Sequence, residues 1–302
     1  MTTDFVTLFA EGLQALGRHY RSPMQEAISA AKLEPPEWYV LFTAYCTAPK
    51  PISASELSRL SPYNAVSLHE QRLQGAIDHG YLIAEDGEAY QISEEGRRAA
   101  VRPIKEAQKA LGSLSPLPEE EMARLVELLR RLVEAVIEAP EPSEKPALLR
   151  SRVVDPGEGA QAATRIDQYL TDLTFYRDDA HIAAWKPYEI PGQTWETLTL
   201  IWREEAHTLD ELAERLEARG QTKESLSVAL EDLVDRGWIS TKNGGYTVTE
   251  QGSTLRQEAE EATDRFYYDP WSALKKSERA EMEALLVKFK EALTPPEEEG
   301  EE

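Results

Sequence analysis

The sequence predicts a mainly α-helical chain that carries two small β-hairpins and consists of two similar halves. Three observations lead to this prediction. Apolar residues recur at three- and four-residue spacing along most segments, which is typical of amphipathic helices. Short strand-forming stretches meet at Asp86 and Gly87 and again at Asn243 and Gly244, and both pairs are strong hairpin signals. These features follow the same order in both halves of the 302 residues.

Local similarities indicate that the second half repeats the first. WYVLFTAYC begins at Trp38 and WETLTLIWR begins at Trp195, an offset of about 157 residues. The offset changes by only a few residues for LQGAIDHGYL and LEDLVDRGWI, for YQISEEG and YTVTEQG, and for EMARLVELLRRL and EMEALLVKFKEA. Chance similarity does not hold its register over such a length, so the chain contains a duplicated unit.

The repeat and the local composition set the predicted domain boundaries. The two units cover residues 1–138 and 162–294. Residues 139–161 contain prolines, glycines and mixed charge, which is typical of a linker. Residues 295–302 follow helix-stopping prolines as an acidic run, and we expect this tail to be disordered.

A long amphipathic helix is predicted to open each unit, and two shorter helices follow it. The third helix has an N-cap signal, with Ser53 or Ser55 ahead of Glu56 in the first unit and Thr208 three residues before Glu211 in the second. The apolar residues of the opening helices lie on one face: Phe5, Leu8, Phe9, Leu13 and Leu16, and in the second unit Ile166, Tyr169, Leu170, Leu173 and Tyr176.

The fourth helix of each unit covers residues 64–79 or 222–236 and ends at a glycine, Gly80 or Gly237. Glycine at this position accepts the left-handed conformation that closes many helices. The hairpin comes next, and two further helices complete the unit. The last helix of the first unit presents one apolar face: Met122, Leu125, Val126, Leu129 and Val133.

This order of elements, with the runs LQGAIDHGYL and YQISEEG and their counterparts, resembles the MarR-like winged helix-turn-helix transcription regulators. In that family the first and last helices build a dimer, and the recognition helices enter the major groove of DNA. Family members usually have one such unit per chain. The resemblance therefore implies tandem winged-helix units that form an intrachain pseudo-dimer, and a monomer with internal pseudo-twofold symmetry.

The resemblance implies that the chain binds double-stranded DNA as a transcription regulator. Direct readout uses polar side chains at base edges, and affinity uses Lys or Arg at phosphates. The candidate DNA-binding residues lie on the two recognition helices and the second hairpin: Asn64, Ser67, His69, Gln71, Arg72, Lys223, Ser225, Lys242 and Asn243.

The charge of the chain opposes DNA binding. Its formal net charge is -22. The first hairpin offers Glu85, Asp86 and Glu88 where a phosphate contact needs a cation. An alternative therefore stays open, in which the chain is a degenerate winged-helix scaffold that binds a protein or a small molecule and not DNA.

A dense polar cluster, FYRDDAHIAAW, predicts a site for a small effector between the winged units and the pairing helices. The alternative for these residues is ordinary core packing of the aromatic rings and ion pairs between helices. No second His or Cys lies at ligand spacing from Asp178 and His181, so no metal site is predicted. The candidate ligand-binding residues are Tyr20, Arg21, Tyr176, Arg177, Asp178, His181, Trp185 and Trp271.

Catalytic and targeting signals are missing from the sequence. It contains no G-x-S-x-G, H-E-x-x-H, Walker or Gly-rich dinucleotide motif, so neither an enzyme nor a cofactor is predicted. The single cysteine, Cys46, fits a reducing compartment. Since no secretory leader and no run of about 20 apolar residues is found, we expect a cytoplasmic protein without membrane association.

Overall fold

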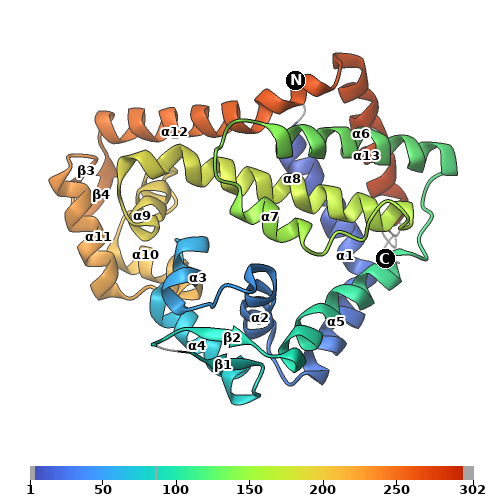
Figure 1. Ribbon diagram of the computed structural model, residues 1–302. Helices are drawn as coiled ribbons and strands as arrows, with labels where there is room; N and C mark the ends of the chain where they lie inside the picture. The colour runs from blue at the N-terminus through green and yellow to red at the C-terminus, as the bar shows by residue number, and fades with distance from the viewer. Residues whose placement is uncertain (1–3, 86, 295–302) are drawn as a thin grey trace, which may run out of the picture. The chain divides into compact units, whose positions relative to one another are not determined.

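A computed structural model describes residues 4–85 and 87–294 of the chain, and these residues are mainly helical (Figure 1). The predicted tail at 295–302 and the turn residue Asp86 lie outside the described residues. The α-helices are α1 (Phe5–Ala30), α2 (Pro35–Thr47), α3 (Ala54–Leu60), α4 (Val66–Asp78), α5 (Glu94–Leu111), α6 (Glu119–Glu138), α7 (Pro146–Arg152), α8 (Ala162–Trp185), α9 (Gly192–Trp202), α10 (Leu209–Leu216), α11 (Lys223–Asp235), α12 (Glu250–Tyr268) and α13 (Lys276–Leu293). Three short 3-10 helices are η1 (Lys186–Tyr188), η2 (Glu217–Arg219) and η3 (Asp269–Ala273).

Four short strands form two antiparallel hairpins, β1 (Leu82–Ala84) with β2 (Tyr90–Ile92) and β3 (Ile239–Lys242) with β4 (Gly245–Val248). The pairing register places Leu82 opposite Ile92 and Lys242 opposite Gly245. The prediction of a mainly α fold with two small hairpins is therefore confirmed. None of the helices described is long and apolar enough to cross a membrane.

The order of elements from α1 to α6 recurs from α8 to α13. Helix α7 lies between these two series, inside the segment predicted to be a linker. The predicted N-caps are present, since Ser53 accepts a hydrogen bond from the Glu56 amide and Thr208 forms a capping box with Glu211.

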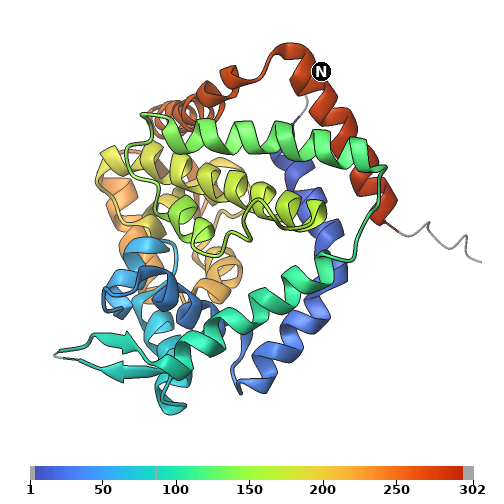
Figure 2. The ribbon, with the colours of Figure 1, turned by 45° about the vertical axis from the view of Figure 1, so that its right-hand side comes forward.

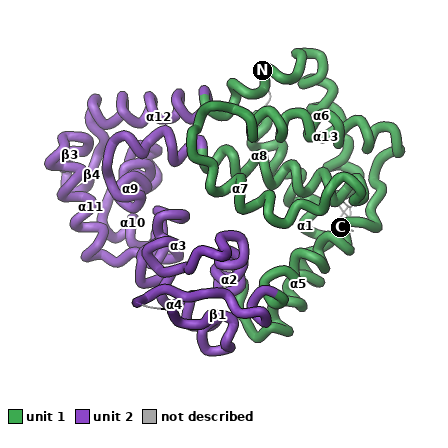
Figure 3. The backbone as a smooth tube through the Cα atoms, in the orientation of Figure 1, with its two compact units in different colours: residues 1–35, 98–179, 266–302 green, residues 36–97, 180–265 purple. Residues whose placement is uncertain are grey.

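The chain divides into two compact units, and each unit draws on both halves of the sequence (Figure 3). Unit 1 contains the described parts of 1–35, 98–179 and 266–302, and unit 2 contains those of 36–97 and 180–265. The sequence boundaries at 1–138 and 162–294 follow the repeat. Repeat and compact unit are thus different divisions of the same chain.

Unit 1 is a helical core in which α1 and α6 both pack against α13. Helix α1 also approaches α8 closely, because a Cβ on Gly12 would lie 3.1 Å from Cδ1 of Leu170. The apolar faces predicted for the opening and closing helices supply the buried side chains: Phe5, Leu8, Phe9, Leu16, Met122, Leu125, Val126, Leu129, Val133, Ile166, Leu170 and Leu173.

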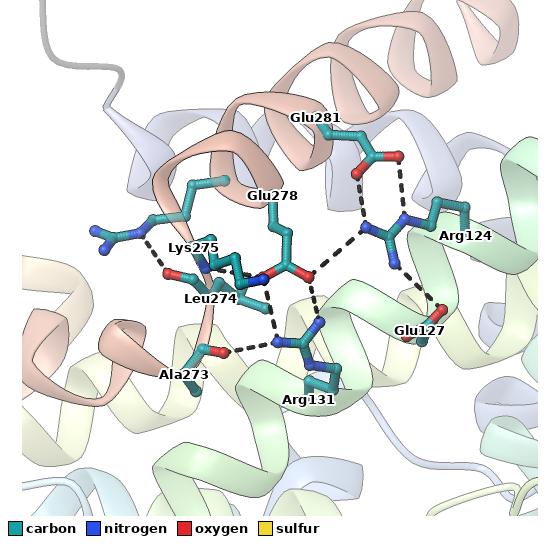
Figure 4. A network of polar contacts seen from close by, with 9 residues as sticks. Arg124, Glu127, Arg131, Ala273, Leu274, Lys275, Glu278 and Glu281 are labelled. Atoms are coloured by element: carbon teal, nitrogen blue, oxygen red, sulfur yellow. Dashed lines mark hydrogen bonds and ion pairs between the residues drawn. The ribbon is translucent and has the colours of Figure 1, made fainter.

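Charged side chains join α6 to η3 and α13 within unit 1 (Figure 4). Arg124 places its Nη2 atom 2.7 Å and its Nε atom 3.0 Å from the carboxylate of Glu281. Arg131 donates to Glu278 at 2.6 Å and to the carbonyl of Ala273 at 2.8 Å. Such forked guanidinium contacts fix the register of two helices more than they stabilise the fold, because they are partly exposed.

Helix α7 is fastened to α8 by buried carboxylates of unit 1. The amides of Ala147 and Leu148 both donate to Asp179 at 2.9 Å. Ser151 donates to Asp172 at 2.6 Å. Burial raises the pKa of Asp179 to about 6, although its two amide donors favour the ionised form. The segment predicted to be a linker is therefore an ordered part of this unit.

Unit 2 contains two heads, which we define as residues 36–93 (first head) and 192–249 (second head). Figure 2 shows the first hairpin extending away from the helices of its head. The same turn chemistry connects hairpin and helix in both heads. Ser93 donates to the carbonyl of Gly80 at 2.9 Å, and Thr249 donates to that of Gly237 at 2.7 Å. Gly80 and Gly237 have φ of +70° and +71°, as their predicted helix-ending role requires.

Candidate recognition surfaces of the two heads

The turns that precede the two recognition helices contact each other inside unit 2. These turns are residues 61–65 before α4 and 217–222 before α11. The Ala65 amide donates to the carbonyl of Arg219 at 2.8 Å. A Cβ on Gly220 would lie only 2.9 Å from the Cβ of Leu68, so the two backbones meet closely. The start of α4 therefore lies against the turn that precedes α11.

Tyr63 anchors this contact between the heads. Its hydroxyl accepts a hydrogen bond from Nε1 of Trp185 at 2.9 Å, and its carbonyl accepts one from Gln221 at 3.0 Å. The guanidinium of Arg219 lies 5.8 Å from the centre of the Tyr63 ring. Tyr63 also packs against the apolar core of the second head. One aromatic side chain thus combines a cation–π contact, hydrogen bonding and core packing.

The candidate DNA-binding residues of the first head have different environments. Ser67 and Gln71 are exposed on α4, whereas His69 is buried with 3% of its surface exposed. Burial lowers the pKa of His69. Asn64 lies in the turn that contacts the second head. Arg72 is half-buried. Its pKa is lowered mainly by burial and to a smaller extent by the charge of Arg219.

In the second head, the candidate cation on α11 is already paired. Lys223 lies 2.6 Å from a carboxylate oxygen of Asp210. The Ser225 hydroxyl accepts a hydrogen bond from the Thr222 amide at 3.0 Å, as part of a helix cap. Lys242 and Asn243 are exposed together at the tip of the second hairpin.

The exposed faces of both recognition helices carry carboxylates beside apolar side chains. Val66 on α4 is 46% exposed and Val228 on α11 is 66% exposed. Around them lie exposed acidic residues of the helices and the first hairpin: Glu70, Asp78, Glu85, Glu88, Glu224, Glu231 and Asp235. Negative charge repels phosphate, so these faces do not favour contact with the DNA backbone.

A groove of about 470 Å³ follows α4 in the first head. Helix α3 and the first hairpin form its other walls. Val66, Leu73 and Ile77 supply apolar lining from α4, and Glu70 and Glu88 supply the charge. The groove can hold a short apolar segment that carries positive charge.

The candidate ligand-binding residues fall into both compact units. Tyr20, Arg21, Tyr176, Arg177, Asp178 and Trp271 belong to unit 1, while His181 and Trp185 belong to unit 2.

In unit 1, Tyr176 is fully buried, and its hydroxyl lies 2.9 Å and 2.8 Å from the carbonyls of Glu141 and Phe266. Trp271 is also buried and stacks on Phe9 at 5.9 Å. The Arg177 guanidinium lies 6.0 Å from the Tyr267 ring centre. These contacts are those of a packed core, and the small-molecule site remains a prediction.

Tyr20 faces a buried carboxyl that the sequence reasoning did not single out. It forms a hydrogen bond with Asp167, and burial raises the pKa of both groups. Asp167 as a residue is partly exposed, but its Oδ1 atom is buried without a hydrogen-bond partner. The pKa of Asp167 accordingly rises to about 7. Within the described ranges, no three His, Cys, Asp or Glu residues gather as metal ligands.

Two further features of unit 2 escaped sequence reasoning, although the repeat contains a signal for each. Tyr63 corresponds to Gly220, so the repeat has a large residue in one turn and a glycine in the other. Arg256 is fully buried between Trp195 and Trp202, with its guanidinium 4.6 Å and 4.8 Å from their ring centres. A charged residue within an apolar helix face marks such a site.

Comparison with known proteins places one match on the second half of the chain. Residues 160–297 match the model of a family described as a helix-turn-helix family. No curated protein and no solved structure matches the chain. The matched segment spans α8 to α13 and includes the whole second head. The chain therefore contains a helix-turn-helix domain.

Proposed function

We propose that this chain is a helix-turn-helix protein that binds a protein partner and does not read DNA with a spaced pair of recognition helices. The contact between the two turns carries the proposal. Paired recognition helices read half-sites about 34 Å apart, which is one turn of DNA. Here the Ala65 amide, at the N-cap of α4, lies 2.8 Å from the carbonyl of Arg219, in the turn that precedes α11. The helices would have to separate before they could enter successive major grooves.

The charge of the heads supports the same proposal. Phosphate contacts supply most of the affinity of DNA-binding proteins, and they come from Lys and Arg. Lys223 is paired with Asp210, and Arg236 with Asp232 at 2.9 Å. Exposed carboxylates surround both pairs. Acidic and apolar faces of this kind suit a protein partner better than a polyanion.

The second candidate is a DNA-binding transcription regulator, and two observations favour it. The family match covers the second head, and Lys242 and Asn243 are exposed at its hairpin tip. In this candidate the second head contacts DNA alone, or a small effector separates the heads. Both candidates include a monomer whose repeats form an internal pseudo-dimer. Light scattering tests the monomer by measuring the molar mass in solution.

Selection of genomic DNA fragments on the immobilised full chain at low salt separates the candidates. We expect the wild type to enrich no sequence over random competitor DNA. Enrichment of a defined sequence that is lost in Lys242→Glu and kept in Glu88→Gln would overturn the protein-partner proposal. A dimer as the only species in light scattering would contradict the internal pairing.

A further inference from the structure

The groove along α4 has the features of a built recognition surface. Val66 is nearly half exposed at its rim, while Leu73 at its base is 3% exposed. Ile77 and Tyr90 continue the apolar lining. The groove therefore offers an apolar strip, and burying such a strip under a partner is favourable.

The charge of the groove has one sign. Among the described residues that line it, the charged ones are Glu70 and Glu88, and both are exposed. Glu85 follows on the same hairpin and is also exposed. A ligand that fills the apolar strip comes close to these carboxylates, so it must bring cations or accept repulsion.

Charge complementarity selects among the possible occupants. DNA is a polyanion and is repelled. The acidic run EEEGEE at the end of this chain has the same sign as the groove and is repelled as well. A helix with apolar residues on one face and Lys or Arg at its flanks satisfies both the strip and the carboxylates.

We propose that this groove binds a cationic amphipathic segment of a partner protein. The inference rests on the proposed function and names the surface and the partner chemistry. The second head gives a natural comparison, because Lys223 stands where the first head has Val66 and Asp210 stands where it has Ser55. Their 2.6 Å ion pair replaces an apolar wall by a charged one. Binding is therefore confined to the first head.

Fluorescence anisotropy with the full chain tests the proposal. The probe is a labelled helical peptide of leucine and lysine with all leucines on one face. A scrambled peptide of the same composition and a leucine and glutamate peptide serve as ligand controls. We expect the amphipathic cationic peptide to bind, and the two controls to bind about tenfold more weakly or not at all.

Paired variants locate the site. Glu70→Lys with Glu88→Lys should weaken peptide binding by about tenfold or more, because two attractions become repulsions. Glu224→Lys with Glu231→Lys makes the same charge change on the exposed face of α11, and binding should change less than about twofold. All four residues are exposed, so the folds should survive, and circular dichroism checks this. A neutral pair, Glu70→Gln with Glu88→Gln, should give an intermediate loss.

Three results would overturn the inference: no binding of the amphipathic cationic peptide, equal binding of the scrambled peptide, or equal weakening by the α11 variants. The last two would show attraction to the net charge of the chain rather than to the groove. These failures differ from a failure of the proposed function. If the peptide experiment fails, a protein partner can still bind another surface. If the DNA selection enriches a defined sequence, the proposed function itself is wrong.

Discussion

The two heads of unit 2 share a backbone plan and differ at the positions that face outward or fill the core. Both end the recognition helix at a glycine, Gly80 or Gly237, and both connect the hairpin through a hydroxyl, Ser93 or Thr249. These shared residues hold unusual backbone conformations or cap amides, so they fix the fold. The side chains between these positions can differ without changing the backbone, and they differ between the two heads.

A buried guanidinium from α12 packs against two tryptophans of the second head, and the first repeat lacks it. Arg256 lies between Trp195 and Trp202 and donates to Glu260 at 2.8 Å. Ala100 occupies the corresponding position of the first repeat. A buried cation needs its carboxylate and its aromatic faces at once, so the second head tolerates fewer substitutions. The comparison predicts that matched variants in the two repeats will have unequal effects.

The largest effect is expected from the paired tryptophans. Trp195→Ala should lower the free energy of unfolding by about 4–5 kcal/mol, at the upper end for such truncations. The reason is that Trp195 stacks on Trp185 and Tyr188, at 5.9 Å and 5.7 Å, besides its contact with Arg256. Trp38→Ala removes a stack on Phe42 at 5.4 Å and should cost about 3 kcal/mol. Urea unfolding followed by circular dichroism measures both. An equal or larger loss in Trp38→Ala would contradict the asymmetry.

The next effect concerns the contact between the heads. Gly220 and Gly80 have nearly equal φ, +72° and +70°, so alanine adds the same backbone strain of about 1 kcal/mol at each. Only Gly220 has a neighbour in the way, since its Cβ would lie 2.9 Å from that of Leu68. Gly220→Ala should therefore cost about 2–3 kcal/mol, and Gly80→Ala about 1 kcal/mol.

Hydrogen exchange makes this comparison specific to the contact. The Ala65 amide donates to the Arg219 carbonyl, so its exchange should become faster in Gly220→Ala and stay unchanged in Gly80→Ala. Similar unfolding free energies, or unchanged exchange of Ala65 in both variants, would show that the heads do not hold each other in solution.

A smaller, pH-dependent effect distinguishes the repeats within unit 1. Burial raises the pKa of Asp167 to about 7 from an ordinary value of 3.8, so the folded chain holds a proton that the unfolded chain releases. The stability from this proton is complete below the unfolded pKa and is lost as the pH rises through the folded pKa. Asp167→Asn should therefore stabilise the chain at pH 8 by about 1–2 kcal/mol, a modest value because the residue is partly exposed. The gain should vanish near pH 4.

Glu11 occupies the corresponding position of the first repeat and forms a surface ion pair with Lys290 at 2.8 Å. Glu11→Gln should change stability by less than about 0.5 kcal/mol at either pH. Thermal melts of both variants against the wild type across this pH range measure the difference. A pH-independent gain in Asp167→Asn would mean that the Asp167 carboxyl is solvated in the folded chain.

The order of elements could be predicted because its signals are local. Glycines at helix ends, N-caps such as Thr208, and the Asn243 and Gly244 turn all act within a few residues. The burial of His69 was also within reach, since His69, Leu73 and Ala76 share one face of α4 by their spacing. Its polar character favours a DNA contact, whereas its position on the helix places it with the core.

Contacts between residues that are distant in the sequence could not be predicted, because they leave no local sequence pattern. The hydrogen bond between Trp185 and Tyr63 joins residues 122 positions apart, and neither residue has a neighbour that indicates the other. The hydrogen bonds that hold α7 against Asp172 and Asp179 could not be predicted for a related reason. The prolines of residues 139–161 indicate a loop when they are considered alone. The carboxylates that hold α7 in place lie on α8. Division of the chain into compact units depends on these contacts, so the repeat boundaries could not reveal it.

The smallest effect on stability, and the strictest test of the comparison, comes from transferring the lining of the first groove to the second head. The triple variant Asp210→Ser, Lys223→Val and Ser227→Glu places the residues of positions 55, 66 and 70 at their counterparts on α10 and α11. Asp210 and Lys223 are exposed and Ser227 is partly exposed, so the melting temperature should stay within about 2 °C of the wild type. If apolar lining with a nearby carboxylate is what recognises the cationic peptide, the variant should gain a second, weaker site. Anisotropy titrations in the Glu70→Lys and Glu88→Lys background isolate that gain, because the first groove is then closed. Absence of any recovery there would show that the shape of the first hairpin, and not the residues along α4, determines binding.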